Sequence, residues 1–475
     1  MNRIALLLAS LAMLGGCTFG PRYQPPTPPA GADAPLVSLN PGIETTAQPP
    51  DDWWRLYSDP LLDKYLAEAF AANTDLKTAE ANLTAARAVL EASRAGNYPA
   101  TRVEAGAVYG RDPVTEEILE IDGAKPQSIW IFDTLFDASY ELDLFGRVKR
   151  SIEASKADAQ SAAAGRDILR ITVAAETARA YAQICTLGEQ LSVAHQSLDV
   201  VSREAWITRQ RYEAGGNSEF DVVRAEGLVA QVRSAIPPLE GQRRAAVFEL
   251  AALLGRTPVH APGEALACVT PPRLGALIPI GDGVALLKRR PDVRLADRRV
   301  AAAGARVGVA IADLYPRINL TGFYGGVASN PTDLTRIVGL AWGVGPQISW
   351  SFPNQIGPRA RIRQAKAGAE AALSEFDSTV LQALKETEQA LATYGAELDH
   401  RQALGEAQDR ARKAFDIAHQ QFLAGSIPDL DLLTTEQVLV AADSAVAASD
   451  SALVQDQIAV FKALGGGWKA ADHAG

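Results

Sequence analysis

The sequence predicts a mixed α and β membrane protein with two internal repeats, in which three copies of the chain share a barrel of twelve strands that continues into a long helical barrel. Three observations lead to this fold class. Four segments alternate apolar and polar residues as strands do, two proline-free runs have the length of very long helices, and the second half of the chain repeats the plan of the first.

The chain begins with the features of a bacterial lipoprotein signal. One early positive charge precedes an apolar run, and the small pair Gly15 and Gly16 leads directly into Cys17. We therefore expect a signal peptide over residues 1–16 and a lipidated Cys17, with an ordinary cleavage site beside a chance cysteine as the alternative. Thr18 stands where an aspartate would retain a lipoprotein in the inner membrane, so we expect an anchor in the outer membrane.

Composition and charge argue against several functional classes. The chain has 475 residues and a net charge of −10 without a basic tract, which argues against nucleic acid as a partner. Its five histidines are dispersed, and no metal-ligand spacing, phosphate-binding loop or nucleophile motif is found, so we expect no enzyme activity, no metal and no cofactor. No apolar stretch of roughly eighteen residues follows Cys17, so we expect strands rather than helices to cross any membrane.

The repeat defines the domain organisation. Residues 211–215 and the segment after them, as far as residue 255, have a counterpart at a constant offset in residues 421–465. The expected divisions are a lipidated extended segment (17–58), a first repeat (59–256), a Pro- and Gly-rich linker (257–283), a second repeat (284–468) and a tail (469–475).

Each repeat is expected to contain a helix, two strands, a long helix and a return helix. In the first repeat these are residues 59–96, 101–110, 129–145, 147–214 and 219–254. In the second repeat they are residues 282–313, 317–328, 338–352, 359–424 and 429–464.

The strand at 129–145 shows the alternation most clearly. Aromatic and aliphatic side chains occupy one face, and Asp133, Asp137 and Glu141 lie on the other, where we expect them to face a lumen and favour cations. Such a pattern is typical of a lipid-facing barrel strand, with a soluble sheet on a core as the alternative. Since even small closed barrels use about eight strands, four strands must be shared between copies.

The two long runs would each extend roughly 100 Å as continuous helices. The second carries a narrow apolar seam at steps of three and four residues, which indicates a coiled coil, although a core-facing helix of a soluble bundle shows the same seam. The shorter helices, stacked in pairs, match the long ones in length, so each chain supplies four columns and three chains supply twelve.

Two cysteines remain after the signal. Cys185 and Cys268 lie at similar distances along helices that run to and from one turn, so a disulfide is geometrically possible. Two independent thiols are the preferred interpretation.

Five motifs in order carry a resemblance to a known family over nearly the whole mature chain. They are Gly20-Pro21-Arg22-Tyr23, Trp53-Trp54 with Asp59-Pro60, the run from Ser139 to Arg147, Arg289-Arg290-Pro291-Asp292-Val293, and the run from Ala463 to Trp468. With them the chain resembles the TolC-like outer membrane factors of tripartite efflux pumps, in the lipoprotein branch that serves resistance-nodulation-division transporters.

The resemblance implies a homotrimeric exit duct in the outer membrane that passively conducts small toxic compounds. Its partners would be a periplasmic adaptor, an inner-membrane resistance-nodulation-division transporter and outer-membrane lipid. The helical hairpin tips, residues 215–223 and 425–433, would close the tube, and the adaptor would dock there on Gly215, Gly216, Gly425 and Ser426.

The resemblance also implies a gate. Leu430 matches a constricting leucine of the family, whereas the family's pore-narrowing aspartate falls on Thr434, which is not acidic. Asp429 and Asp431 are candidates to supply that charge, with solvated residues of a helix first turn as the alternative interpretation.

Two other functions stay open at this stage. A type I protein-secretion channel could use the same architecture, and a periplasmic coiled-coil scaffold lipoprotein could share the anchor and the helical hairpins. The lipoprotein signal and the Arg-Arg-Pro-Asp motif favour the efflux duct over the first, and four amphipathic strands favour it over the second.

Overall fold

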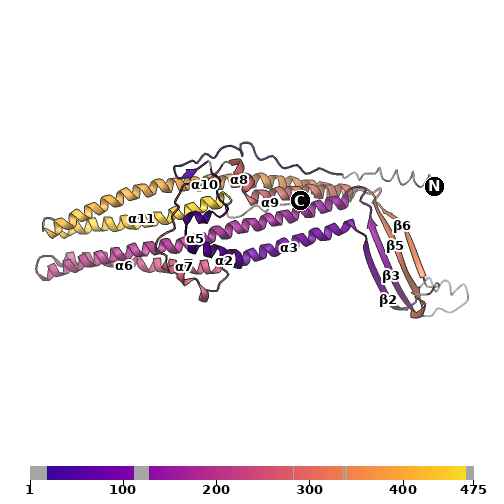
Figure 1. Ribbon diagram of the computed structural model, residues 1–475, viewed down its shortest axis with the longest axis horizontal. Helices are drawn as coiled ribbons and strands as arrows, with labels where there is room; N and C mark the ends of the chain where they lie inside the picture. Colours follow the sequence, from indigo (N-terminus) through magenta and orange to yellow (C-terminus); the bar gives the residue numbers. More distant parts are fainter. Residues whose placement is uncertain are drawn as a thin grey trace. The chain divides into compact units, whose positions relative to one another are not determined.

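A computed structural model describes residues 19–45, 47–111, 128–281, 283–334, 336 and 340–466, without the side chains of residues 283–285. Cys17 and the predicted signal peptide lie outside the described residues. The chain divides into two compact units, and Figure 1 labels their helices and strands. Unit 1 comprises residues 1–27, 82–162 and 295–376; unit 2 comprises residues 28–81, 163–294 and 377–475.

Unit 1 contains a four-stranded antiparallel sheet in the order β2-β3-β5-β6 (Figure 1). Its strands are β2 (Ala100–Gly110), β3 (Ile129–Glu141), β5 (Arg317–Ala328) and β6 (Leu340–Ser349). In its register Val103 lies opposite Phe136, Phe136 opposite Tyr324, and Tyr324 opposite Trp342, so large apolar side chains gather on one face. Trp342 is 70% exposed, so no layer of the described chain covers this face.

Strand β3 ends four residues earlier than the sequence predicted. The expected strand ran to residue 145, but Asp143 accepts hydrogen bonds from the backbone nitrogens of Val148 (3.0 Å) and Lys149 (2.8 Å) and so caps the following helix. Gly146 has a φ of 82° at this junction. The strand expected at 338–352 ends at Ser349, and its first two residues lie outside the described part.

Nine α-helices are described, several of them with residues in both units. They are α2 (Pro60–Ala72), α3 (Thr74–Arg94), α5 (Arg147–Glu213), α6 (Glu219–Ser234), α7 (Ile236–Leu253), α8 (Gly283–Arg289), α9 (Pro291–Ala312), α10 (Ile356–Leu423) and α11 (Asp429–Ala463). Short elements in the described residues are β1 (Ile43–Glu44), which pairs in parallel with β4 (Ile278–Pro279), and the 3₁₀ turns η1 (Trp53–Tyr57), η2 (Ala95–Asn97), η3 (Pro258–His260), η4 (Gly263–Ala267) and η5 (Pro331–Asp333).

Three helices that the sequence predicted as continuous are each broken in two. The first breaks at Asn73, whose side chain accepts hydrogen bonds from the backbone of Asp75 and Leu76 and caps α3. The second restarts as α7 with prolines in its first turn, and the third restarts as α9 at Pro291. Proline lacks an N–H and fits a first helical turn, so each of these breaks has a local cause.

Helix α11 departs in one respect from the sequence analysis, which found no stretch after Cys17 apolar enough to span a membrane. An 18-residue window of α11 has a mean hydropathy of 1.2, which is enough for a span by length and composition. The core helix of a soluble protein meets the same criterion, and α11 buries Val454, Ile458 and Phe461 inside unit 2. The criterion is met because α11 is rich in alanine and valine.

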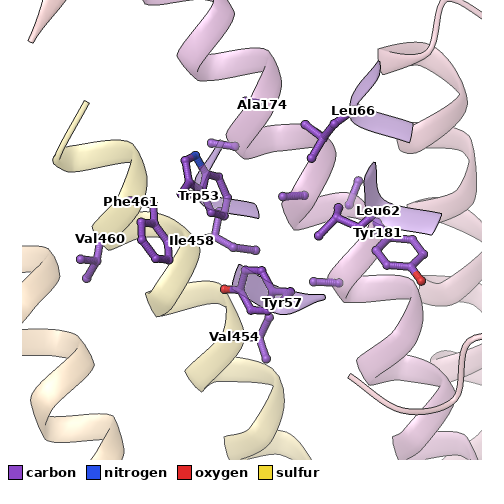
Figure 2. Packing of buried hydrophobic residues seen from close by; sticks show 14 of the residues in the cluster. Trp53, Tyr57, Leu62, Leu66, Ala174, Tyr181, Val454, Ile458, Val460 and Phe461 are labelled. Atoms are coloured by element: carbon purple, nitrogen blue, oxygen red, sulfur yellow. The ribbon is translucent and has the colours of Figure 1, made fainter. Parts of the chain in front are cut away.

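The core of unit 2 is centred on Trp53, which is completely buried (Figure 2). Its ring stacks on Phe461 of α11 with a centroid distance of 4.7 Å and an interplanar angle of 13°. Leu62 and Leu66 of α2 and Tyr181 of α5 belong to the same cluster. The segment before the first helix is thereby fixed to the last helix of the chain.

A disulfide joins Cys185 of α5 to Cys268 after η4, with a Cα separation of 4.8 Å. The preference for two independent thiols was therefore wrong. The Arg243 guanidinium donates to the carbonyl oxygens of Cys268 (2.6 Å), Leu266 (2.8 Å) and Ile184 (3.1 Å), so it holds the linker on α5. These contacts bring α5 and the segment at Cys268 together. From the sequence alone, the two could be placed only at similar distances from the turn between them.

Replacing Trp53 by alanine is expected to lower the free energy of unfolding by about 3–5 kcal/mol, because it leaves a cavity against Phe461. Trp53→Phe keeps an aromatic ring and should lose less. Denaturant unfolding followed by circular dichroism measures both variants. Equal losses for the two would contradict a stacking role.

Replacing Cys268 by serine is expected to cost about 4–5 kcal/mol of unfolding free energy, because the disulfide closes a long loop in the unfolded chain. Reduction of the unmodified protein should reproduce the loss, and the Cys268→Ser protein should not respond to reductant. Titration of the denatured, unreduced protein that finds both of these thiols free would contradict the disulfide.

Candidate functional site

The candidate site is the pair of turns at which each long helix meets its return helix, both within unit 2. Gly215 and Gly425 have φ values of 81° and 72°, in the left-handed region where a β-carbon is unfavourable. Gly216 N donates to Arg211 O at 2.7 Å, and Ser426 N donates to Gln421 O at 2.9 Å. We call residues 214–218 tip 1 and residues 424–428 tip 2. Their matching closure has the form of a glycine-terminated helix end.

The two return helices begin differently. At tip 1, Ser218 and Asp221 form a reciprocal capping box at the start of α6, and these hydrogen bonds lower the pKa of Asp221. At tip 2, Pro428 occupies the cap position of α11 without a side-chain hydrogen bond. Asp429 and Asp431 in the first turn instead place negative charge near the helix N-terminus.

The structure separates the three residues expected at the gate. Leu430 is 44% exposed and Asp431 is also exposed. Asp429 instead accepts a hydrogen bond of 2.9 Å from the hydroxyl of Thr208 on α5, and burial raises its pKa. Asp429 thus links the two hairpins, whereas the exposed Leu430 and Asp431 can contact groups outside the chain.

Two apolar clusters hold the hairpins together near the tips. In one, Leu433 of α11 packs with Val201 of α5 and with Leu228 and Val232 of α6. In the other, Leu432 of α11 packs with Ala418 and Phe422 of α10, and Ile207 of α5 lies against them. The guanidinium of Arg211 on α5 lies 3.9 Å from the centroid of the Phe422 ring, a cation–π contact.

A set of polar residues that sequence reasoning missed belongs to the same contact. Glu204 of α5 lies 3.3 Å from His419 of α10, measured from Oε1 to Nε2. Glu436 of α11 is 1% exposed, and neither of its carboxylate oxygens has a hydrogen-bond partner among the described residues. Burial first, and then the charges of Glu204 and Asp429, raise the pKa of Glu436 to about 8.

The repeat contained a signal for this residue. Glu226 is the counterpart of Glu436 in the first repeat, and it lies at the surface, where Arg209 Nε donates to it at 3.1 Å. Glu436 has no such cation within the described part of the chain, and it follows Leu433 by three residues on the buried face of α11. A carboxylate within an apolar helical seam is the pattern that could have identified it.

The acidic residues of β3 share one face of the strand by their even spacing. Glu141 is paired, since Arg147 Nε donates to it at 2.7 Å. Asp133 lies over Gly106 of β2, where a β-carbon would stand 2.6 Å from its Oδ1. Of the three residues expected to face a lumen, Glu141 is therefore already paired with Arg147, the first residue of α5.

The Arg-Arg-Pro-Asp motif is structural. Arg290 is buried and donates to Ala463 O at 2.7 Å, to Asp292 at 2.7 Å and to Glu386 at 2.8 Å. It thereby joins the start of α9 to α10 and to the end of α11. Among the described residues no group of three or more His, Cys, Asp or Glu side chains could hold a metal ion.

Comparison with protein families matches the chain to the outer membrane efflux protein family over residues 65–256 and 284–466. Among curated relatives, the pyoverdine export outer membrane protein OpmQ of Pseudomonas putida is 29% identical over 99% of this chain and 98% of its own length. The toluene efflux pump outer membrane protein TtgI of Pseudomonas putida is 28% identical over 99% of both chains.

Solved structures give the same picture. The outer-membrane channel OprN superposes with a TM-score of 0.84 at 33% identity, over 95% of this chain and all of its own. The open state of the Neisseria gonorrhoeae MtrE channel superposes with a TM-score of 0.82 over 95% of this chain and 98% of its own. At 24% identity the second likeness concerns the fold alone.

Proposed function

The chain belongs to the outer membrane efflux protein family, and from this premise we propose that three copies form the exit duct of a tripartite pump. It is an outer-membrane efflux protein and not an enzyme. In the proposed assembly a periplasmic adaptor joins the duct to an inner-membrane resistance-nodulation-division transporter. The transporter supplies the energy, and the duct conducts small toxic compounds passively.

One observation carries the shared barrel: the sheet of unit 1 ends in two strands, β2 and β6, whose outer edges pair with no strand in the described residues. In a bilayer every backbone polar group needs a partner, so an open sheet must close. Four strands are too few for a closed barrel, which needs about eight. Three copies, joined β2 to β6, give twelve strands and leave no edge.

The lengths of the two long helices support a long duct. Helices α5 and α10 have 67 and 68 residues. At 1.5 Å per residue each is about 100 Å long. Twelve helical columns from three copies would then form the wall of a tube beneath the barrel. The two hairpins of one chain have the same plan, which supports similar places for them in that wall. In this proposal the lipid on Cys17 is an additional tether.

We assign the resting closure to tip 2 and its first helical turn, with Leu430 as an apolar ring and Asp431 as its charge, while Asp429 holds this turn on α5 through Thr208. The exposure of Leu430 supports this role, because a ring in a trimer axis must project from its own chain. The adaptor would contact the tips at Gly215, Gly216, Gly425 and Ser426, all of them exposed.

The cargo class is small organic compounds, by analogy with relatives whose names specify pyoverdine export and toluene efflux. Asp133 and Asp137 would face the lumen of the barrel and favour cationic cargo.

The trimer is tested by native mass spectrometry of the detergent-solubilised protein. Three times the mature chain mass is expected, and single-channel conductance in planar bilayers should accompany that species alone. A monomer that conducts, or a trimer that never conducts even with its tips forced apart, would overturn the duct.

Leu430→Ser is expected to raise resting conductance several-fold, because a hydroxyl wets an apolar constriction. Leu381→Ser is the matched control, since Leu381 is an exposed leucine (55%) on α10 away from the tips. An unchanged conductance in the Leu430 variant would remove this residue from the closure.

A further inference from the structure

Two faces meet where the hairpins contact each other. On α5, Val201, Glu204 and Thr208 succeed one another at steps of three and four residues, and on α11 Leu433, Glu436 and Val440 do the same. Leu433 packs on Val201, and Val440 lies against the same cluster. Glu436 is therefore enclosed between apolar contacts of the α5–α11 interface.

The charged neighbours of this interface come from all four helices of the tips. Helix α5 contributes Glu204 with Arg203 and Arg211, and α10 contributes His419. Helix α11 contributes Asp429, on which Asp221 and Arg224 of α6 also act. The groups that act directly on Glu436 are the two acids Glu204 and Asp429, and both disfavour its ionised form.

We propose that Glu436 is a proton-controlled latch between the two hairpins: with its proton bound, α11 packs against α5, and release of that proton to solvent loosens the start of α11. A neutral carboxyl costs much less free energy in the apolar seam than a buried carboxylate beside two other acids. Thr208 and Asp429 would lose their hydrogen bond as the helices separate. The latch itself does not rest on the proposed function; only an effect of the latch on conduction through the duct would rest on it.

The direction of the pH dependence is set by proton binding. Packing raises the pKa of Glu436 from 4.5 to about 8. Between these values the packed interface holds a proton that the loosened one has lost, so raising the pH favours the loosened form. The interface is most stable below pH 4.5 and loses that stability as the pH rises through about 8.

The protonation state is tested directly on the full-length protein in detergent micelles. The infrared absorption of a protonated carboxyl should be present at neutral pH in the unmodified protein, disappear with a midpoint near pH 8, and be absent in Glu436→Gln. Glu204→Gln removes a negative neighbour and should move the midpoint to lower pH. A Glu436 already ionised at pH 6 would overturn the proposal.

The latch itself is tested by hydrogen exchange of the first turns of α11, corrected for the intrinsic effect of pH. Between pH 6 and pH 9 the protection of these amides should fall by about 10- to 100-fold in the unmodified protein. It should stay constant in Glu436→Gln. Glu219→Gln, an exposed acid at the start of α6, is the matched control and should behave as the unmodified protein does.

Protection that stays constant while the carboxyl titrates would refute the latch and leave the duct untouched. Neither measurement needs an open channel, so a protein that fails to conduct would refute the proposed function without affecting these results.

Discussion

Backbone hydrogen bonding at the two edges of the four-stranded sheet is the constraint on which the proposed assembly depends. Inside the sheet the backbone groups of each strand pair with those of the next strand, from Ala100 opposite Ser139 to Arg317 opposite Ser349. At the outer sides of β2 and β6 the same groups have no strand to pair with among the described residues. An exposed apolar sheet with open edges is an aggregation hazard in water and is not tolerated in lipid. A barrel shared between copies, as we propose, would resolve both problems at once.

The two hairpins show how a repeated plan can serve unequal purposes. Both tips close on a left-handed glycine with the same backbone hydrogen bonds. Tip 1 then carries a complete capping box, whereas tip 2 opens with a proline and two acids. Glu226 is neutralised at the surface by Arg209, whereas its counterpart Glu436 is buried with other acids around it. The second hairpin therefore combines weaker local capping with a costly buried group, a combination that agrees with the movement we propose for it.

Periodicity and the proline-free length of the two long runs made much of the fold predictable. The alternation of β3 and the length of α5 are properties of local sequence, and both elements appear near their expected positions. Element ends were less predictable, because Asp143 and Asn73 act as caps only once a helix lies beyond them. The disulfide joins two segments that Arg243 also bridges by hydrogen bonds to three carbonyl groups, and no spacing in the sequence reveals that contact.

At the site, the tips and their glycines were predictable and the polar contacts between helices were not. The direction of Asp429 toward Thr208 depends on how α11 packs against α5, which local pattern does not determine. Glu436 was visible as a carboxylate in an apolar seam, and its comparison with Glu226 required the structure of both repeats.

The disulfide has one further consequence for how the chain responds to damage. Cys185 and Cys268 enclose the end of α5, tip 1 and both helices after it. A protease that cuts the exposed backbone at tip 1 therefore leaves two fragments still covalently joined. Such a nicked chain would keep the migration of the intact polypeptide in a non-reducing denaturing gel and separate into two pieces once reduced. Tip 1 can thus be severed without either fragment being lost from the molecule while the disulfide is intact.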